Sequence, residues 1–149
     1  MDLTKEISAL EQDLVQWRRE FHRIPETAME EEKTASTIAE KLRAWGITVH
    51  TGVGGTGVVG ILHGKQEGKI FGIRADIDAL PVTEETGLPF ASTHPGRMHA
   101  CGHDVHITIA LGTARILSTC RDTLKGTVVF FFQPCLLYTS DAADDLLCV

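Results

Sequence analysis

The chain has 149 residues, of which 43% are hydrophobic and 23% are charged, and its formal net charge is −6. This length and composition suit one globular domain with a hydrophobic core, while the acidic balance argues against a nucleic-acid partner. No apolar run is long enough to span a membrane. The start of the chain is charged and resembles no export signal, so we expect a cytoplasmic protein whose four cysteines form no disulfide framework.

Two amphipathic helices are predicted near the start of the chain. Apolar residues recur at spacings of three and four over residues 3–21, and Pro25 ends this first helix. A capping box formed by Thr27 and Glu30 predicts the start of the second helix. Gly46 stands where a C-terminal cap glycine is expected.

Four strands are predicted among and after these helices, over residues 47–50, 58–64, 69–77 and 126–134. The second and third strands are joined by a short turn and are predicted to pair as a hairpin. The last strand is apolar throughout, which suits a buried parallel strand. Because strands alternate with helices, the predicted fold class is α/β.

A glycine-rich stretch, GVGGTG at residues 52–57, matches the dinucleotide fingerprint G-x-G-x-x-G. Asp76 follows about twenty residues later, as that fingerprint requires. A nucleotide site also needs a helix that begins at these glycines, so that its N-terminus meets the pyrophosphate. The next residues, VVGILHG, predict a strand instead. We therefore interpret the match as a chance one in a turn.

Two aspartates lie at the end of the third predicted strand, in IRADIDALP at residues 73–81. Carboxylates at strand ends of open α/β folds line the crevice where ligands bind, although Asp76 and Asp78 could also be ordinary turn residues. A long connection over residues 78–98 follows, rich in proline and glycine. Loops of this length within a compact domain are often functional.

A cluster of ligand-type side chains comes next, HACGHDVH at residues 99–106. Cys101 and His103 are separated by one residue, and thiolate sulfur and imidazole nitrogen are both good ligands for zinc and similar ions. Asp104 is predicted to cap a helix over residues 105–118, or to orient an imidazole. A polar loop and a thiol nucleophile with a histidine base are the alternative interpretations.

Three stretches together resemble a known family: RADIDALPVTEETGLPFAS, MHACGHDVHITIALGTARIL and GTVVFFFQP. They resemble the N-terminal part of the aminoacylase and hippurate-hydrolase family of dinuclear metallopeptidases, which includes the indole-3-acetyl-amino-acid amidohydrolases. The resemblance implies that residues 1–134 are the N-terminal part of a truncated catalytic domain, with a mixed, mostly parallel sheet flanked by helices. It also implies a metal-dependent amidohydrolase that cleaves the amide bond of small N-acyl amino acids.

The same resemblance implies roles for single residues. Cys101 and His103 match two ligands of a centre that holds two divalent ions, manganese or zinc. Asp76 matches the carboxylate that tunes this catalytic site without binding metal. Gln133 and Pro134 match the strand end before the catalytic glutamates. A homodimer formed through a later domain is implied as well, with neither nucleic acid nor membrane as a partner.

The chain departs from the family pattern after Pro134. Residues 135–137 read Cys-Leu-Leu where the family has a small residue and two glutamates, the general base and a metal ligand. Residues 135–149 resemble translated read-through of a sequencing adapter, with a divergent C-terminal helix as the alternative. We therefore expect this chain to be an inactive fragment of its parent enzyme. A cysteine-nucleophile hydrolase that uses Cys101 and a non-catalytic metal-binding module are the other functional hypotheses.

Overall fold

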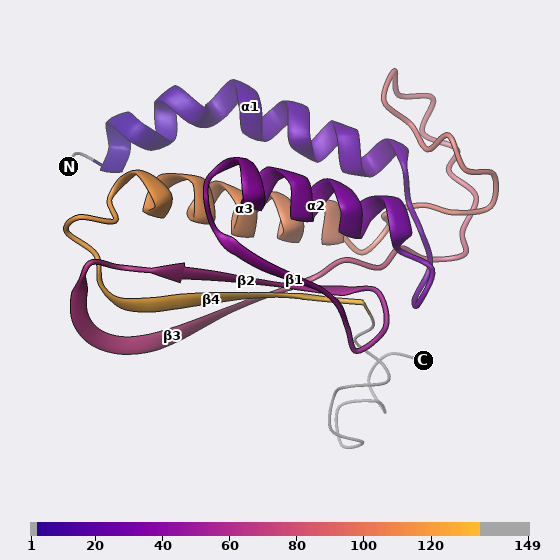
Figure 1. The fold of residues 1–149 in the computed structure, drawn as a ribbon. Coiled ribbons are helices and arrows are strands. Elements are labelled where there is room, and N and C mark those ends of the chain that lie inside the picture. Colours follow the sequence, from indigo (N-terminus) through magenta and orange to yellow (C-terminus); the bar gives the residue numbers. More distant parts are fainter. Residues whose placement is uncertain (1–2, 135–149) are drawn as a thin grey trace.

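The computed structural model describes residues 3–134, and its three helices cover one face of a four-stranded sheet (Figure 1). The helices are α1 (Leu3–Arg23), α2 (Glu32–Ala44) and α3 (His103–Thr119). The strands are β1 (Thr48–Val53), β2 (Gly57–His63), β3 (Gln66–Asp76) and β4 (Lys125–Gln133). Helix α2 lies on β1 and β2, α3 lies on β3 and β4, and α1 packs against α3.

The predictions for residues 135–149 lie outside the described part of the chain. Within residues 3–134, none of the helices has the combination of length and apolar composition that a membrane span requires.

The sheet has the strand order β1-β2-β4-β3 and is mixed. Strand β2 runs antiparallel to both β1 and β4, and β3 runs parallel to β4. The predicted hairpin between residues 58–64 and 69–77 is wrong, because β4 lies between these two strands. The predicted α/β class with a mixed sheet and helices is confirmed, but the described strands form two antiparallel pairs and one parallel pair, so this part of the sheet is not mostly parallel as predicted.

The hairpin joins β1 to β2 instead, through the glycine-rich stretch of residues 52–57. Gly54 and Gly55 have φ of 64° and 106°, which residues with a side chain rarely adopt. Strand β2 follows at once, so no helix begins at these glycines. The stretch is a hairpin turn. This confirms the prediction that its match to the dinucleotide fingerprint arose by chance.

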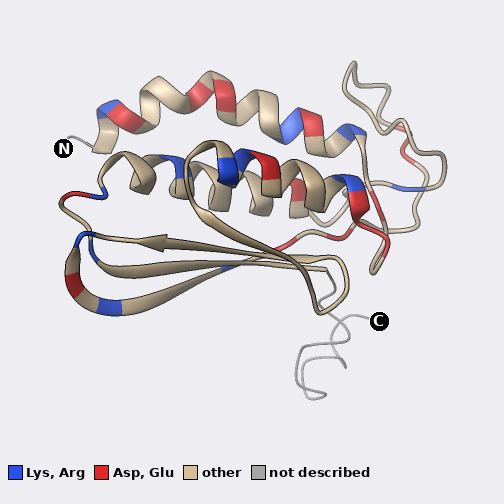
Figure 2. Cartoon of the chain, viewed as in Figure 1, with Lys and Arg blue, Asp and Glu red and all other residues tan. Residues whose placement is uncertain are grey.

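The core lies between the sheet and the two inner helices. Along β4, Val128, Phe130 and Phe132 face the helices and are buried, whereas Phe131 is 45% exposed on the opposite face. Strands β2 and β4 carry no charged side chain apart from Lys125 (Figure 2). This apolar composition lets both strands occupy the middle of the sheet.

Helix α2 begins later than its predicted capping box. The Thr27 hydroxyl does donate to the Glu30 carboxylate at 2.9 Å, but the helix starts at Glu32. Glu26 caps it instead, because its carboxylate accepts two backbone N–H groups of the first turn, at 3.2 and 2.8 Å. A carboxylate at this end also interacts favourably with the helix dipole.

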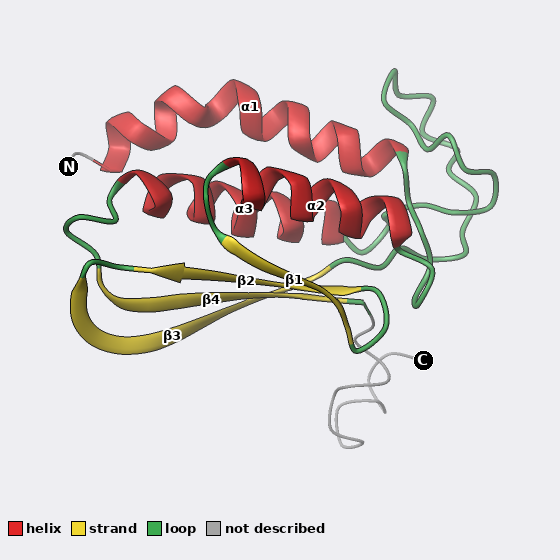
Figure 3. Cartoon of the chain, viewed as in Figure 1, coloured by secondary structure: helices red, strands yellow, loops and turns green. Residues whose placement is uncertain are grey.

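Several elements end at one side of the molecule. The carboxyl ends of β3 and β4, the last turn of α1 and the first turn of α3 lie there, beside the loop of residues 77–102 (Figures 1 and 3). Asp76 at the end of β3 pairs in register with Gln133 at the end of β4. The aspartate motif and the histidine cluster are therefore brought together at this end.

Candidate metal centre

The histidine cluster lies where the long loop enters α3. Gly102 precedes the helix with a φ of 87°, a left-handed conformation that favours glycine, and no side chain caps the helix there. The helix begins at His103, so the prediction that Asp104 is its N-cap is wrong. Asp104 lies within the first turn and is fully buried. The turn leaves the Cys101 thiol exposed just before the helix.

Asp78 holds the His103 ring. The ring nitrogen Nδ1 lies 2.8 Å from the backbone oxygen of Asp78 and 2.9 Å from its carboxylate oxygen Oδ1. Both oxygens are acceptors, so Nδ1 carries a proton, and in the neutral ring Nε2 keeps its lone pair. Histidine metal ligands almost always donate their other ring N–H to such an oxygen. The Asp78 carboxylate also raises the pKa of His103, against the opposing effect of partial burial.

Asp76 contacts a different histidine. Its carboxylate accepts a hydrogen bond from Arg74 at 2.6 Å and lies 3.3 Å from Nδ1 of His106. The backbone N–H of Asp76 donates to the same Nδ1 at 3.1 Å. Because Nδ1 accepts this hydrogen bond, the proton of the ring in its neutral form is on Nε2.

The aspartate that contacts the candidate ligand is therefore Asp78, which sequence reasoning noticed at the strand end without giving it this role. The tuning role assigned to Asp76 stays a prediction. Side chains alternate along an extended chain, so two aspartates separated by one residue point the same way. This spacing signals that either could serve the site, but it does not say which of them meets His103.

His99 lies apart from the exposed side of the cluster. It is 4% exposed, and neither ring nitrogen has a hydrogen-bond partner among the described residues. Burial lowers its pKa to about 4, so the ring is neutral at pH 7. It packs beside His22, with 6.5 Å between the ring centroids. His99 is thus a buried ring under the long loop.

Cys101 and His103 have the donor chemistry of a partial metal site. A thiol and an imidazole with a free Nε2 are both suitable ligands, but zinc sites use three or four protein ligands. Within residues 3–134, no three His, Cys, Asp or Glu side chains gather closely enough to hold an ion. A complete centre would therefore need ligands from outside the described residues.

The end of β4 lies beside the two aspartates. The backbone N–H of Ile77 donates to the Gln133 carbonyl at 3.0 Å, and Arg74 Nε donates to the Gln133 side chain at 2.5 Å. Residues that follow Pro134 in a complete domain would thus leave β4 next to Asp76.

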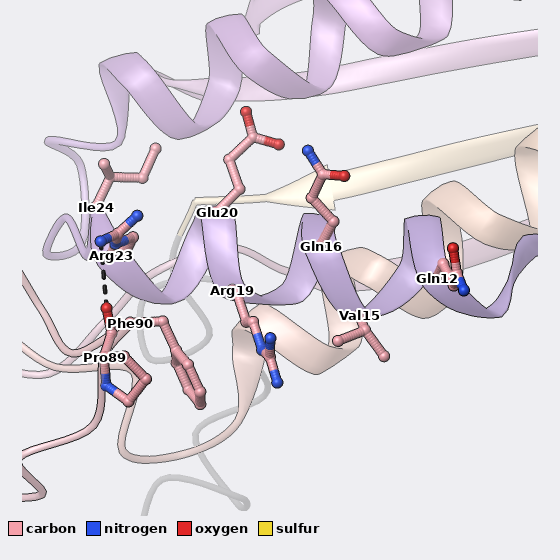
Figure 4. A pocket seen from close by; sticks show the side chains of 9 residues that line it. All are labelled: Gln12, Val15, Gln16, Arg19, Glu20, Arg23, Ile24, Pro89 and Phe90. Atoms are coloured by element: carbon pink, nitrogen blue, oxygen red, sulfur yellow. Dashed lines mark hydrogen bonds between the residues drawn. The ribbon is translucent and has the colours of Figure 1, made fainter.

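A cavity of about 710 Å³ lies elsewhere, along the outer face of α1 (Figure 4). The Arg23 guanidinium donates to the carbonyl of Pro89 at 3.2 Å, and that of Arg19 lies 4.8 Å from the centre of the Phe90 ring. The described residues that line this cavity include no His, Cys or Asp. It therefore offers none of the chemistry found at the start of α3.

Comparisons with known proteins agree with this geometry. Residues 72–135, which hold both motifs, match the model of Peptidase family M20/M25/M40. The chain is 42% identical over 132 residues to the N-acyl-L-amino acid amidohydrolase of Geobacillus stearothermophilus, covering 89% of this chain and 36% of that protein. It is 44% identical over 146 residues to the N-acetyldiaminopimelate deacetylase of Streptococcus pneumoniae, covering 91% and 38%.

Solved structures show the same likeness. The YXEP protein of Bacillus subtilis, described as a dinuclear metal binding peptidase from the M20 family, superimposes with a TM-score of 0.81 at 43% identity, over 86% of this chain and 36% of that one. A putative aminohydrolase of methicillin-resistant Staphylococcus aureus gives 0.88 at 38% identity, over 97% and 39%. The chain thus spans between a third and two fifths of the length of these relatives. Its aspartate strand end and its Cys-x-His turn both lie within the segment that matches Peptidase family M20/M25/M40.

Proposed function

We propose that the parent protein of this chain is a metal-dependent amidohydrolase that cleaves the amide bond of small N-acyl amino acids. The observation that carries the proposal is the His103 ring, whose Nδ1 is held by Asp78 while Nε2 has no hydrogen-bond partner among residues 3–134, with only Gly102 between it and the exposed Cys101. Relatives that are named as an amidohydrolase and a deacetylase support amide hydrolysis as the reaction.

In this proposal Cys101 and His103 are ligands to divalent metal ions, which we expect to be two and to be manganese or zinc. When bound, such ions polarise the amide carbonyl and activate a water molecule. The chain itself supplies orientation. Asp78 fixes the ring plane and tautomer of His103, Gly102 bends the backbone between the two ligands, and Asp76 tunes the charge at the strand end.

The division of the chain belongs to the same proposal. Residues 1–134 are the N-terminal part of the catalytic domain, and residues 135–149 are foreign to it. A homodimer formed by a later domain and a cytoplasmic location complete the proposed parent enzyme. The source DNA tests this division, because reading past codon 134 should reveal codons for a small residue and two glutamates.

The 149-residue chain should hydrolyse no N-acyl amino acid above background, even with added manganese or zinc. It lacks the glutamate base after Pro134, and general-base catalysis alone contributes roughly a hundred- to ten-thousand-fold in rate. Clear turnover by the purified chain would show that the tail or the site is wrongly interpreted.

Metal titration of the purified chain tests the ligand assignment. Zinc should bind weakly, because two protein ligands form only part of a site, and replacing Cys101 and His103 together by alanine should abolish the binding. The matched control replaces Cys120 and His63, a cysteine and a histidine at the other end of the molecule, and should leave zinc affinity unchanged. Equal affinity of the Cys101→Ala, His103→Ala variant and the unaltered chain would refute the assignment.

A thiol nucleophile is the second candidate, because Cys101 is exposed directly before a helix N-terminus. A full-length relative rebuilt on this N-terminal segment separates the candidates. We expect its activity to stop with a chelator and to return with metal. An acyl group trapped on Cys101 during turnover would favour the thiol instead, and metal binding without turnover would favour a non-catalytic module.

A further inference from the structure

Four ionisable side chains from three separate segments meet beside the ligand turn. Arg18 and His22 come from α1, Glu84 from the loop of residues 77–102, and Asp104 from the first turn of α3. The side chains of His22 and Glu84 are 3% exposed and that of Asp104 is fully buried, while Arg18 is 33% exposed. We name these four residues the α1 charge cluster.

Asp104 is the centre of the α1 charge cluster. Its carboxylate oxygen Oδ2 accepts from His22 Nδ1 at 2.7 Å and lies 2.9 Å from Arg18 Nε. The other oxygen, Oδ1, accepts the backbone N–H of Val105 at 2.9 Å. Both oxygens therefore have donors, and charge-assisted hydrogen bonds of this kind are stronger than neutral ones.

His22 extends the cluster to the long loop. Its Nε2 lies 3.2 Å from a Glu84 carboxylate oxygen, so each ring nitrogen faces an acidic group. An imidazole can donate from both nitrogens only when it carries a positive charge. Glu84 also accepts the backbone N–H of Ser92 at 2.6 Å and the Thr86 hydroxyl, which fixes the loop around it. Arg18 and His22 thus face the carboxylates of Asp104 and Glu84.

Phe90 covers the cluster on the side of the loop. Its ring lies 5.3 Å from the Arg18 guanidinium and meets the His22 ring edge-on at 5.8 Å. Excluding water strengthens the ion pairs, but well-packed apolar residues often stabilise a core at least as well as buried charges do. A need for stability alone therefore does not explain this arrangement.

The ligand turn needs support that its local sequence does not supply. Gly102 has a left-handed φ and no side chain caps α3, so the backbone between Cys101 and His103 is weakly constrained by its neighbours. Asp78 holds the His103 ring from the end of β3. Asp104, the residue that follows His103, is held by α1 instead.

We propose that the α1 charge cluster is a positioning device that fixes the turn of residues 101–103, and so the placement of the two metal ligands relative to each other. Its purpose rests on the proposed metal-binding function, whereas its effect on the turn does not. The four residues touch neither metal nor substrate in this proposal. They act through the backbone of the first turn of α3.

Hydrogen exchange of the metal-free chain tests the effect on the turn. The backbone N–H groups of Val105 and His106 both donate to the Gly102 carbonyl, at 3.0 and 3.2 Å. That of Val105 also donates to Asp104, so the His106 amide is the one that reports on the turn without contacting the cluster. Asp104→Asn keeps the shape of the side chain but removes its charge. It should speed exchange at these two amides roughly tenfold or more, because hydrogen bonds to charged groups contribute more than neutral ones.

The control and the second variant remove other partners. Glu20→Gln breaks a different α1 ion pair, which joins Lys41 of α2 at 3.0 Å, and should leave exchange at the turn unchanged. His22→Gln removes the bridge to Glu84 but keeps the Arg18–Asp104 contact, and it serves if Asp104→Asn does not fold. Unchanged exchange at the His106 amide in both folded cluster variants would overturn the proposal.

Cobalt(II) binding tests whether the turn positions the ligands. At equal folded fraction, Asp104→Asn or His22→Gln should weaken cobalt binding about tenfold or more and alter the thiolate-to-cobalt absorption band. If amide exchange is faster while the cobalt spectrum and affinity are unchanged, the claim that the cluster positions Cys101 and His103 is wrong. If the unaltered chain binds no cobalt while exchange still responds, the positioning of the turn stands and the proposed metal-binding function fails.

Discussion

Two aspartate–histidine pairs lie side by side at the end of β3, and their hydrogen bonds run in opposite directions. His103 Nδ1 donates to Asp78, whereas His106 Nδ1 accepts the backbone N–H of Asp76. The two rings are one helical turn apart, with 6.3 Å between their centroids. When both rings are neutral, only that of His103 keeps a lone pair on Nε2.

Residue spacing alone does not show which of the two histidines has a ring nitrogen available to a metal ion. Both aspartates stand at a strand end and both histidines stand in the first turn of α3, so composition and periodicity treat the pairs alike. The partner atom decides which ring nitrogen is protonated. Exposure differs as well, since the side chain of His106 is 43% exposed and that of His103 is 17% exposed.

The strongest test of the comparison exchanges each histidine for glutamine. His103→Gln should reduce zinc binding to background, because the chain then keeps one ligand of the proposed pair. His106→Gln should leave zinc affinity close to that of the unaltered chain. Calorimetric titration of both variants measures the contrast, and the opposite ranking would show that the tautomers are wrongly assigned.

Replacing either aspartate by asparagine should weaken zinc binding less than His103→Gln does, and Asp78 should matter more than Asp76. Asp78→Asn should weaken zinc binding, and loss of a hydrogen bond to a ligand typically costs about ten- to a hundredfold in affinity. We expect the lower end of this range, because the backbone oxygen of Asp78 still accepts from His103. Asp76→Asn should weaken binding less. Equal losses in the two variants would remove the distinction between the pairs.

The pH dependence of the metal-free chain also distinguishes the Asp78–His103 pair from the Asp76–His106 pair. Asp78 raises the pKa of His103 above its ordinary value of 6.5, so the protonated ring is stabilised in the folded state. This contribution to stability is fully present below the unfolded pKa and is lost as pH rises through the folded pKa. NMR titration of the His103 ring should show the raised pKa, and Asp78→Asn should lower it.

Urea unfolding gives the matching stability measurement. The difference in free energy of unfolding between the unaltered chain and Asp78→Asn should shrink as pH rises through the folded pKa of His103. Asp76→Asn should change the His103 titration less, because its carboxylate is the weakest of the influences that raise this pKa. A larger shift in that variant would contradict the assigned pairing.

The smallest expected effect concerns the ion pair beside Asp76. Arg74→Gln removes a partner whose side chain is 46% exposed, so solvent weakens the interaction. The free energy of unfolding should fall by less than about 1 kcal/mol, as for exposed ion pairs in general. Zinc affinity should not change. A marked loss of zinc binding in this variant would mean that Asp76 and its partners support the ligands more than their contacts indicate.

Local patterns predicted the helices and the central strand well. The first predicted helix is α1, and the run of residues 126–134 became β4, because a repeating apolar spacing specifies which face of an element is buried. The pairing of strands was not predictable in the same way. β2 and β3 follow each other in the chain, yet β4 separates them, since pairing depends on segments far apart in sequence.

From the residues alone, the strand end with Asp76 and Asp78 was predicted to line a ligand crevice, and the family resemblance placed Asp76, Cys101 and His103 in one site as a prediction. Only the tertiary structure decided which aspartate meets which histidine, and that Asp104 binds His22, 82 residues away, instead of capping α3. The physical reason is that spacing sets the direction of a side chain. The tautomer and protonation state of that side chain depend instead on the atoms that the fold places in contact with it.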